Sequence, residues 1–156
     1  MLESGRVMGI DYGVKRVGIA VSDPMGIIAQ GIETLQNDQA IVSKIIDIVK
    51  KMAVKEIVIG KPLKLSGLEG DSAAGAANFA DRLRRKLAQE RLDSVEIVEW
   101  DERFTTNIAK QTQIEMGMRK KERQKKGNLD RMASQLILQS YLDAHPRSKP
   151  VKEKEL

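Results

Sequence analysis

The feature of this chain that most constrains its fold is a change in the spacing of its apolar residues near residue 38. Before that point, two short turns separate three short apolar runs, which is typical of an antiparallel meander. After it, apolar residues at helical spacing alternate with short β-branched runs. The expected strands cover residues 7–10, 17–21, 27–35, 56–60 and 95–100, and the expected helices cover 38–53, 76–87, 106–116 and 129–144.

A strand meander followed by alternating helices and strands predicts a mixed α/β sheet. Helical crossovers make the fourth and fifth strands parallel to a neighbour, with right-handed connections. We expect that neighbour to be the first strand, because it is the most apolar of the meander. The first, fourth and fifth strands then end at the same edge of the sheet, which is where open α/β sheets bind their ligands.

The length of 156 residues fits one domain. We expect that domain to cover residues 1–145, with an aliphatic core, and residues 146–156 to form a polar, frayed tail. No apolar run reaches the ~20 residues of a membrane span. The N-terminus lacks the apolar stretch of a signal peptide, so a cytoplasmic protein without a membrane partner is expected.

The chain has no cysteine and a single histidine, His145. These counts exclude a disulfide framework, a thiol nucleophile and a cysteine-ligated zinc site. A catalytic dyad or a metal site built on histidine is also disfavoured, because His145 lies next to Pro146 in the tail. Any bound metal would need oxygen ligands, which favours hard ions such as Mg²⁺ or Mn²⁺.

Carboxylates are expected at the shared sheet edge. Asp11 follows the first apolar run, and Asp101 and Glu102 follow the last strand. Each alone is most simply a polar residue at the end of a strand. Asp130 differs, because it lies on the apolar stripe of the last expected helix, and a buried unpaired carboxylate is costly. The other members of that stripe are Ala133, Ile137 and Tyr141.

Carboxylates from three distant segments suit Mg²⁺ or Mn²⁺. Two such ions about 3.5–4 Å apart can stabilise both the attacking water and the leaving oxygen of a phosphodiester. This chemistry needs no histidine base, which agrees with the composition. The pattern therefore favours a metal-dependent nuclease.

A basic run immediately precedes Asp130. Its net charge of +5 equals that of the whole chain, so the remaining residues are neutral overall. It could hold backbone phosphates beside the metals, or it could be a solvated charged loop. With 3% aromatic residues, recognition would depend on backbone and shape rather than on base stacking. The cations of the run are Arg119, Lys120, Lys121, Arg123, Lys125 and Lys126.

Three further cations lie beside the candidate carboxylates. Lys15 and Arg16 follow Asp11 and could contact a phosphate, or could simply be turn residues. Arg103 could contact nucleic acid or pair with Asp101 or Glu102 and orient it. The sequence by itself leaves these alternatives open.

Four motifs together resemble the YqgF family, also called RuvX, which groups Holliday junction resolvases and nucleases that process pre-16S rRNA. The similarity covers about residues 5–143. It implies an RNase H-like fold, a five-stranded mixed sheet in the order 3-2-1-4-5 flanked by helices, and a divalent metal cofactor. The motifs are residues 11–23, residues 60–70 with Gly60-Lys61-Pro62, the Asp101-Glu102-Arg103 segment through Thr106, and Asp130 before an apolar helix.

The resemblance also implies roles for the acids. Asp11 matches the metal-bridging aspartate of the first strand, and Asp130 matches the acidic residue of the last helix. The middle ligand departs from the related RuvC resolvases, because Gly60 and Lys61 stand where those proteins have an acid at the end of strand four. We therefore expect Asp11, Glu102 and Asp130 to be catalytic, with Asp101 as a supporting metal ligand.

The leading interpretation is an endonuclease that processes the 5′ end of pre-16S rRNA, in contact with the small ribosomal subunit. The second is a Holliday junction resolvase acting on branched DNA as a symmetric homodimer. The third is a non-catalytic RNA-binding assembly factor with structural carboxylates. An actin-like ATPase, prompted by Asp11-x-Gly13, is disfavoured, because such enzymes pair two domains and this chain has room for one.

Overall fold

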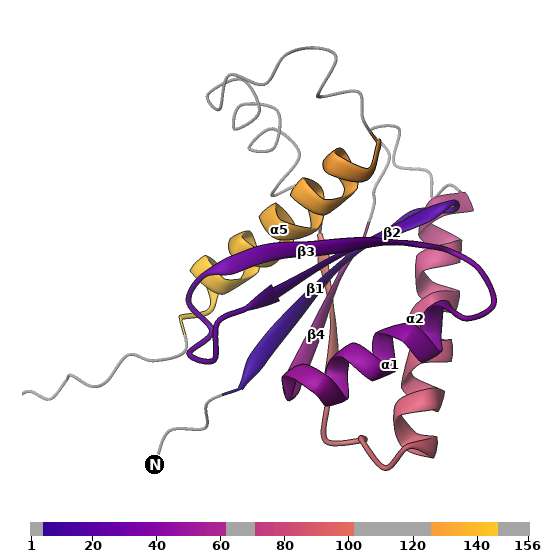
Figure 1. Ribbon diagram of the computed structural model, residues 1–156, viewed down its shortest axis with the longest axis horizontal. Coiled ribbons are helices and arrows are strands. Elements are labelled where there is room, and N and C mark those ends of the chain that lie inside the picture. Colours follow the sequence, from indigo (N-terminus) through magenta and orange to yellow (C-terminus); the bar gives the residue numbers. More distant parts are fainter. Residues whose placement is uncertain (1–4, 62–70, 102–125, 147–156) are drawn as a thin grey trace, which may run out of the picture.

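The computed structural model describes residues 5–61, 71–101 and 126–146 of the 156-residue chain (Figure 1). Within these residues, five strands form one sheet, and helices lie on both of its faces. The strands are β1 (Arg6–Tyr12), β2 (Arg16–Ser22), β3 (Ala29–Gln36), β4 (Val54–Lys61) and β5 (Glu96–Asp101). The helices are α1 (Ile41–Met52), α2 (Asp71–Gln89) and α5 (Lys126–Ala144).

The strand order is β3-β2-β1-β4-β5, which confirms the expected topology. β2 pairs antiparallel with both β1 and β3, as expected for a meander with short turns. β4 pairs parallel with both β1 and β5, because helices carry the chain back across the sheet between them. The carboxyl ends of β1, β4 and β5 therefore share one edge.

The core has two layers, one on each face of the sheet. Met8 and Ile10 of β1 pack with α1 and α2 in the larger cluster. Val7 belongs to the smaller cluster, which α5 covers with Ile137 and Leu138. Consecutive residues of β1 thus point to opposite faces, as the pleat requires. Figure 1 shows α1 and α2 on one face and α5 on the other.

Helix α5 is held against the edge strand β3 by two glutamines. The backbone N–H of Ala29 donates to Gln139 Oε1 at 2.8 Å, and that of Gly31 donates to Gln135 Oε1 at 2.9 Å. Gln139 Nε2 also donates to the carbonyl of Ile27 at 3.0 Å. As the residue numbers of α5 fall, those of β3 rise, so α5 runs antiparallel to β3 and β1.

Several element boundaries differ from the sequence-based expectation. Residues 27 and 28 belong to the turn before β3, and Ile27 and Ile28 are 50% and 65% exposed. Helix α5 begins at Lys126 instead of Leu129, so this basic residue lies in the helix and Asp130 is its fifth residue rather than its second. Gly127 and Asn128 resemble a helix stop in the sequence, yet the helix includes them.

Two expectations fall outside the described residues. These are the helix over residues 106–116 and the tail beyond residue 146, so the domain limits at residues 145 and 146 remain predictions. In the parts of the chain that the structure describes, the helices are too short or too polar to cross a membrane.

Candidate functional site at the carboxyl edge of the sheet

The parallel register shows how the strand ends meet. Ile10 of β1 pairs with Ile59 of β4, and Lys61 pairs with Asp101 at the end of β5. Asp11, one residue beyond Ile10, also pairs with Gly18 of β2. Asp11 therefore lies inside β1 rather than after it, because the antiparallel pairing continues to Tyr12 and Val17. Asp11 and Asp101 lie at the same edge, as expected.

The two faces of the sheet separate these carboxylates. An added Cβ on Gly9 would meet Leu138 of α5, so alternation places Asp11 on the α5 face as well. On β5, Trp100 contacts Ser140 of α5 through its Nε1–H at 3.3 Å. Asp101, the next residue, therefore lies on the face that α1 and α2 cover. Asp11 and Asp101 are half-buried on opposite faces.

Helix α5 brings Asp130 to the end of the sheet that carries Asp11. The backbone oxygen of Ser134 would lie 3.1 Å from a Cβ on Gly9, so this turn of α5 crosses β1 at Gly9. Asp130 precedes Ser134 by four residues, about 6 Å along the helix. Asp11 follows Gly9 by two residues, about 6.6 Å along the strand. Because α5 and β1 are antiparallel, both steps lead toward the carboxyl edge.

Aromatic packing on the opposite face fixes the end of β1. The ring of Tyr12 packs against Phe79 of α2 at a centroid distance of 5.2 Å. A Cβ on Gly75 would lie 3.0 Å from the Tyr12 ring, so this glycine lets α2 approach closely. The residue after Asp11 is thus held by α2, which limits the freedom of the Asp11 backbone.

Asn37 anchors the turn between β1 and β2. Its side-chain amide donates to the carbonyl of Gly13 at 2.8 Å, and its backbone N–H donates to the carbonyl of Lys15 at 2.9 Å. A Cβ on Gly13 would lie 2.5 Å from the carbonyl oxygen of Arg16, so only glycine fits there. Sequence reasoning missed Asn37 and Tyr12 as supports of this edge. The single available signal was an asparagine immediately after an apolar strand.

The predicted nucleic-acid-binding residues are only partly described. Lys15 is exposed in the β1–β2 turn, and Arg16 is half-buried at the start of β2, so both lie at the Asp11 edge. Lys126 begins α5, but its side chain is outside the described part of the chain. The remaining predicted contacts, which also lie outside it, are Arg103, Arg119, Lys120, Lys121, Arg123 and Lys125.

The candidate metal ligands are described to different extents. No group of three or more His, Cys, Asp or Glu side chains capable of holding a metal occurs among the described residues. Glu102 and the side chain of Asp130 lie outside the described part of the chain. Asp11 offers a half-buried carboxylate, and the candidate set is all oxygen, which is the donor chemistry that suits Mg²⁺ or Mn²⁺.

One known protein family matches nearly the whole chain. The sequence profile of the RuvX family, described as Holliday junction resolvase, matches residues 5–144. The chain belongs to the RuvX family. This confirms the resemblance inferred from the four motifs, and it covers all the candidate site residues.

This RuvX chain matches curated relatives over nearly the whole length of each relative. A protein from Sulfurihydrogenibium sp. is 39% identical over 138 residues, covering 88% of this chain and 90% of the relative. A protein from Halalkalibacterium halodurans is 42% identical over 142 residues, covering 88% and 96%. Both carry the name "Putative pre-16S rRNA nuclease".

Several solved structures that are similar to this chain are Holliday junction resolvases. Thermus thermophilus RuvC in complex with a Holliday junction substrate has a TM-score of 0.56 at 13% identity, covering 94% of this chain and 99% of that chain. The yeast mitochondrial resolvase Ydc2 has a TM-score of 0.58 at 11% identity, covering 91% and 79%. At such low identity these similarities establish the fold, which is RNase H-like as expected.

Proposed function

We propose that this RuvX protein is a metal-dependent endonuclease, a hydrolase of phosphodiester bonds that acts in 5′-end processing of pre-16S rRNA. The observation that carries the proposal is the register of the parallel strands, which places Asp11 and the end of β5 at one edge of the sheet. The names of the relatives support the RNA substrate. The protein would then work in the cytoplasm, on the precursor of the small ribosomal subunit.

We assign the metal site to Asp11, Glu102 and Asp130. The position of Asp101 on the face opposite Asp11 favours Glu102, the next residue in sequence, as the middle ligand. Bound Mg²⁺ or Mn²⁺ would supply a nucleophile and stabilise charge on the scissile phosphate. The chain contributes a carboxylate on the middle strand, held by pairing with β2 on one side and β4 on the other.

The nucleic acid would be held by cations around this edge. Lys15 on the β1–β2 turn and Arg16 at the start of β2 lie at the same edge as Asp11, and Asn37 holds this turn in place. Cations at such positions neutralise backbone phosphates and set the register of the strand without reading its bases. We assign the same role to Arg103 and to the basic run that leads into α5.

The test compares Asp11→Asn with a matched variant, Asp47→Asn, which removes the same charge from an exposed position on α1. Each protein is incubated with a pre-16S leader RNA and Mg²⁺ or Mn²⁺. Loss of one carboxylate that would hold the metal should reduce cleavage by Asp11→Asn on the order of 100-fold, whereas Asp47→Asn should cleave like the parent. Equal cleavage by Asp11→Asn and the parent would refute the catalytic assignment.

A Holliday junction resolvase is the second candidate, because the family description and the structural neighbours both point to branched DNA. The phosphodiester chemistry would be the same, and a symmetric homodimer would cut opposed strands. Symmetric nicks in a four-way junction, without cleavage of the RNA leader, would replace the first proposal with this one. Binding of RNA that survives both chelation and Asp11→Asn, without any cleavage, would instead indicate an assembly factor.

A further inference from the structure

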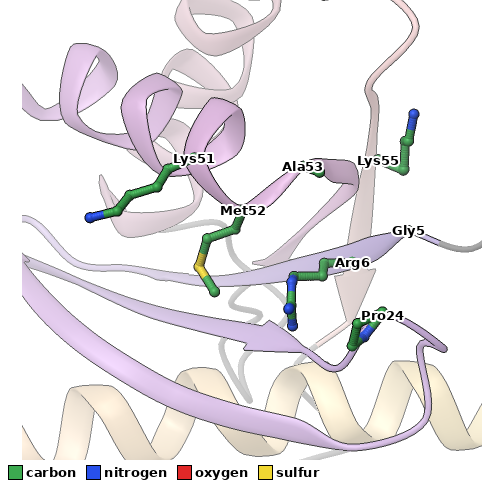
Figure 2. A pocket seen from close by; sticks show the side chains of 7 residues that line it. All are labelled: Gly5, Arg6, Pro24, Lys51, Met52, Ala53 and Lys55. Atoms are coloured by element: carbon green, nitrogen blue, oxygen red, sulfur yellow. The ribbon is translucent and has the colours of Figure 1, made fainter.

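A cavity of about 510 Å³ opens at the end of the sheet opposite Asp11. It lies between the start of β1, the C-terminal end of α1 and the turn that follows β2, as Figure 2 shows. Its size is within the range of about 300–1,000 Å³ that is common for ligand sites. Nothing in the proposed nuclease chemistry uses this part of the molecule.

Among the described residues that line the cavity, three are cations and none is acidic. They are Arg6 on β1, Lys51 near the end of α1 and Lys55 on β4. In the described part of the chain none of the three forms an ion pair, whereas the neighbouring Lys50 contacts Glu90 at 2.6 Å. Unpaired cations gathered without a balancing acid favour an anionic ligand.

The nearby acid and the nearby helix end are both otherwise engaged. Asp23, next to the lining residue Pro24, directs its carboxylate into its own turn, where it accepts backbone N–H groups. The N–H of Ala53, which ends α1, donates to the carbonyls of Lys50 and Val49. The N–H of Ala53 is therefore already used within the helix end, and Arg6, Lys51 and Lys55 are the candidate partners of an anion in the cavity.

The cations are spread along the cavity instead of converging on one point. In Figure 2, the side chains of Lys51 and Lys55 point away from each other, Lys51 toward the left of the view and Lys55 upward, and Arg6 lies between the two residues. Met52 and Pro24 also line the space and add apolar surface. A single small ion could contact only one of these charges closely. A nucleic-acid backbone carries one phosphate per nucleotide, so it can contact several separated cations at once.

We propose that this cavity is a second binding surface for the backbone of a nucleic-acid strand, held by Arg6, Lys51 and Lys55. The inference rests on the proposed nuclease function and adds a contact remote from the cleavage site. Arg6 and Asp11 are five residues apart on β1, about 17 Å along the strand. A long substrate can reach both places, whereas an oligonucleotide confined to the Asp11 edge cannot.

The test measures binding of a fluorescent leader RNA by anisotropy, with EDTA present so that no cleavage occurs. Lys51→Gln/Lys55→Gln is compared with Arg82→Gln/Arg85→Gln, which removes two charges from exposed positions on α2. Both double variants lower the net charge of the chain from +5 to +3. Arg6 is left in place, because its Nη1 donates to the carbonyl of Ser22 at 3.0 Å and stabilises the fold.

The Lys51→Gln/Lys55→Gln variant should bind the leader about tenfold more weakly than the parent. The plot of log binding constant against log salt concentration should also be shallower by about 1.4, because each contact with a single-strand phosphate contributes about 0.7 to that slope. Arg82→Gln/Arg85→Gln should differ from the parent by less than twofold. A short oligonucleotide that is cut at the Asp11 edge should bind all three proteins alike. Thermal unfolding would verify that both double variants are folded.

Four outcomes would overturn this inference. Equal weakening in both double variants would show that only net charge matters. Displacement of the RNA by millimolar inorganic phosphate from the parent, but not from Lys51→Gln/Lys55→Gln, would indicate a site for a small ion. Unchanged binding in Lys51→Gln/Lys55→Gln, with normal cleavage, would refute the second surface and leave the nuclease proposal intact. A parent protein that binds neither RNA nor junction DNA would refute both.

Discussion

At the scale of single residues, Gly9 sets how closely α5 approaches the sheet. A Cβ at this position would lie 2.7 Å from the Cβ of Leu138 and 3.1 Å from the backbone oxygen of Ser134. Neither atom can rotate away, because both belong to the helix backbone or are attached to it. A side chain here must move α5 as a body, and α5 also carries Asp130.

The prediction at this scale concerns Gly9→Ala. Overpacking of this kind costs about 1–3 kcal/mol, so the midpoint of urea unfolding should fall accordingly. The shift of α5 should also separate Asp130 from Asp11. At a temperature where the variant is fully folded, its cleavage should therefore fall further than the fraction unfolded explains. An unchanged unfolding midpoint would show that the sheet and the helix tolerate the extra carbon.

At the scale of elements, the turn between β2 and β3 is organised by one carboxylate. Asp23 Oδ1 accepts the N–H groups of Ile27 and Ile28, both at 2.7 Å, and Oδ2 accepts that of Met25 at 3.1 Å. Burial alone raises the pKa of Asp23, but the hydrogen bonds from Ile28, Ile27 and Met25 together lower this pKa below its ordinary value. The ionised form therefore stabilises the turn.

We predict that ionised Asp23 stabilises the protein by an amount that depends on pH. Because the folded-state pKa lies below the unfolded value of about 3.9, the contribution is fully present above that value and is lost as the pH falls through the folded pKa. Asp23→Ala should destabilise the protein by about 1–2 kcal/mol at neutral pH. Urea unfolding at a series of pH values should show a smaller acid-induced loss in Asp23→Ala than in the parent. Identical pH profiles would contradict this role.

At the scale of the whole molecule, α5 also protects an edge of the sheet. An exposed edge strand presents unpaired backbone groups to which another chain can pair. Gln135 and Gln139 occupy the N–H groups of Gly31 and Ala29 on the outer side of β3. Helix α5 therefore covers one side of the core and also closes part of the sheet edge.

The prediction at this scale is that Gln135→Ala/Gln139→Ala loses stability and gains self-association. Each lost hydrogen bond should cost about 0.5–1.5 kcal/mol, although alanine is the better helix former. Light scattering after size-exclusion chromatography should detect larger species than in the parent. Gln89→Ala, at the exposed end of α2, serves as the control and should behave like the parent. A monodisperse, equally stable double variant would disprove the edge-protecting role.

The directions of the strands follow from the sequence alone, because they depend on the length and type of the connections between neighbouring elements. The turns around Gly13 and Asp23 leave too few residues for anything except antiparallel neighbours, and the long helices force β4 and β5 to be parallel to β1. Order and direction then place Asp11 and Asp101 at one edge. The start of α5 at Lys126 could not be predicted, because Gly127 has a low helix propensity and reads as a break in the sequence.

Chain order determined which edge of the sheet carries the candidate acids, because strand direction depends only on the length and type of each connection. The face on which each acid lies was decided by the tertiary structure. The face follows from which side of the sheet a helix covers, and apolar stripes suit either side equally well until packing selects one. Contact of Trp100 with α5 placed Asp101 opposite Asp11, and no local pattern in the sequence contains that information.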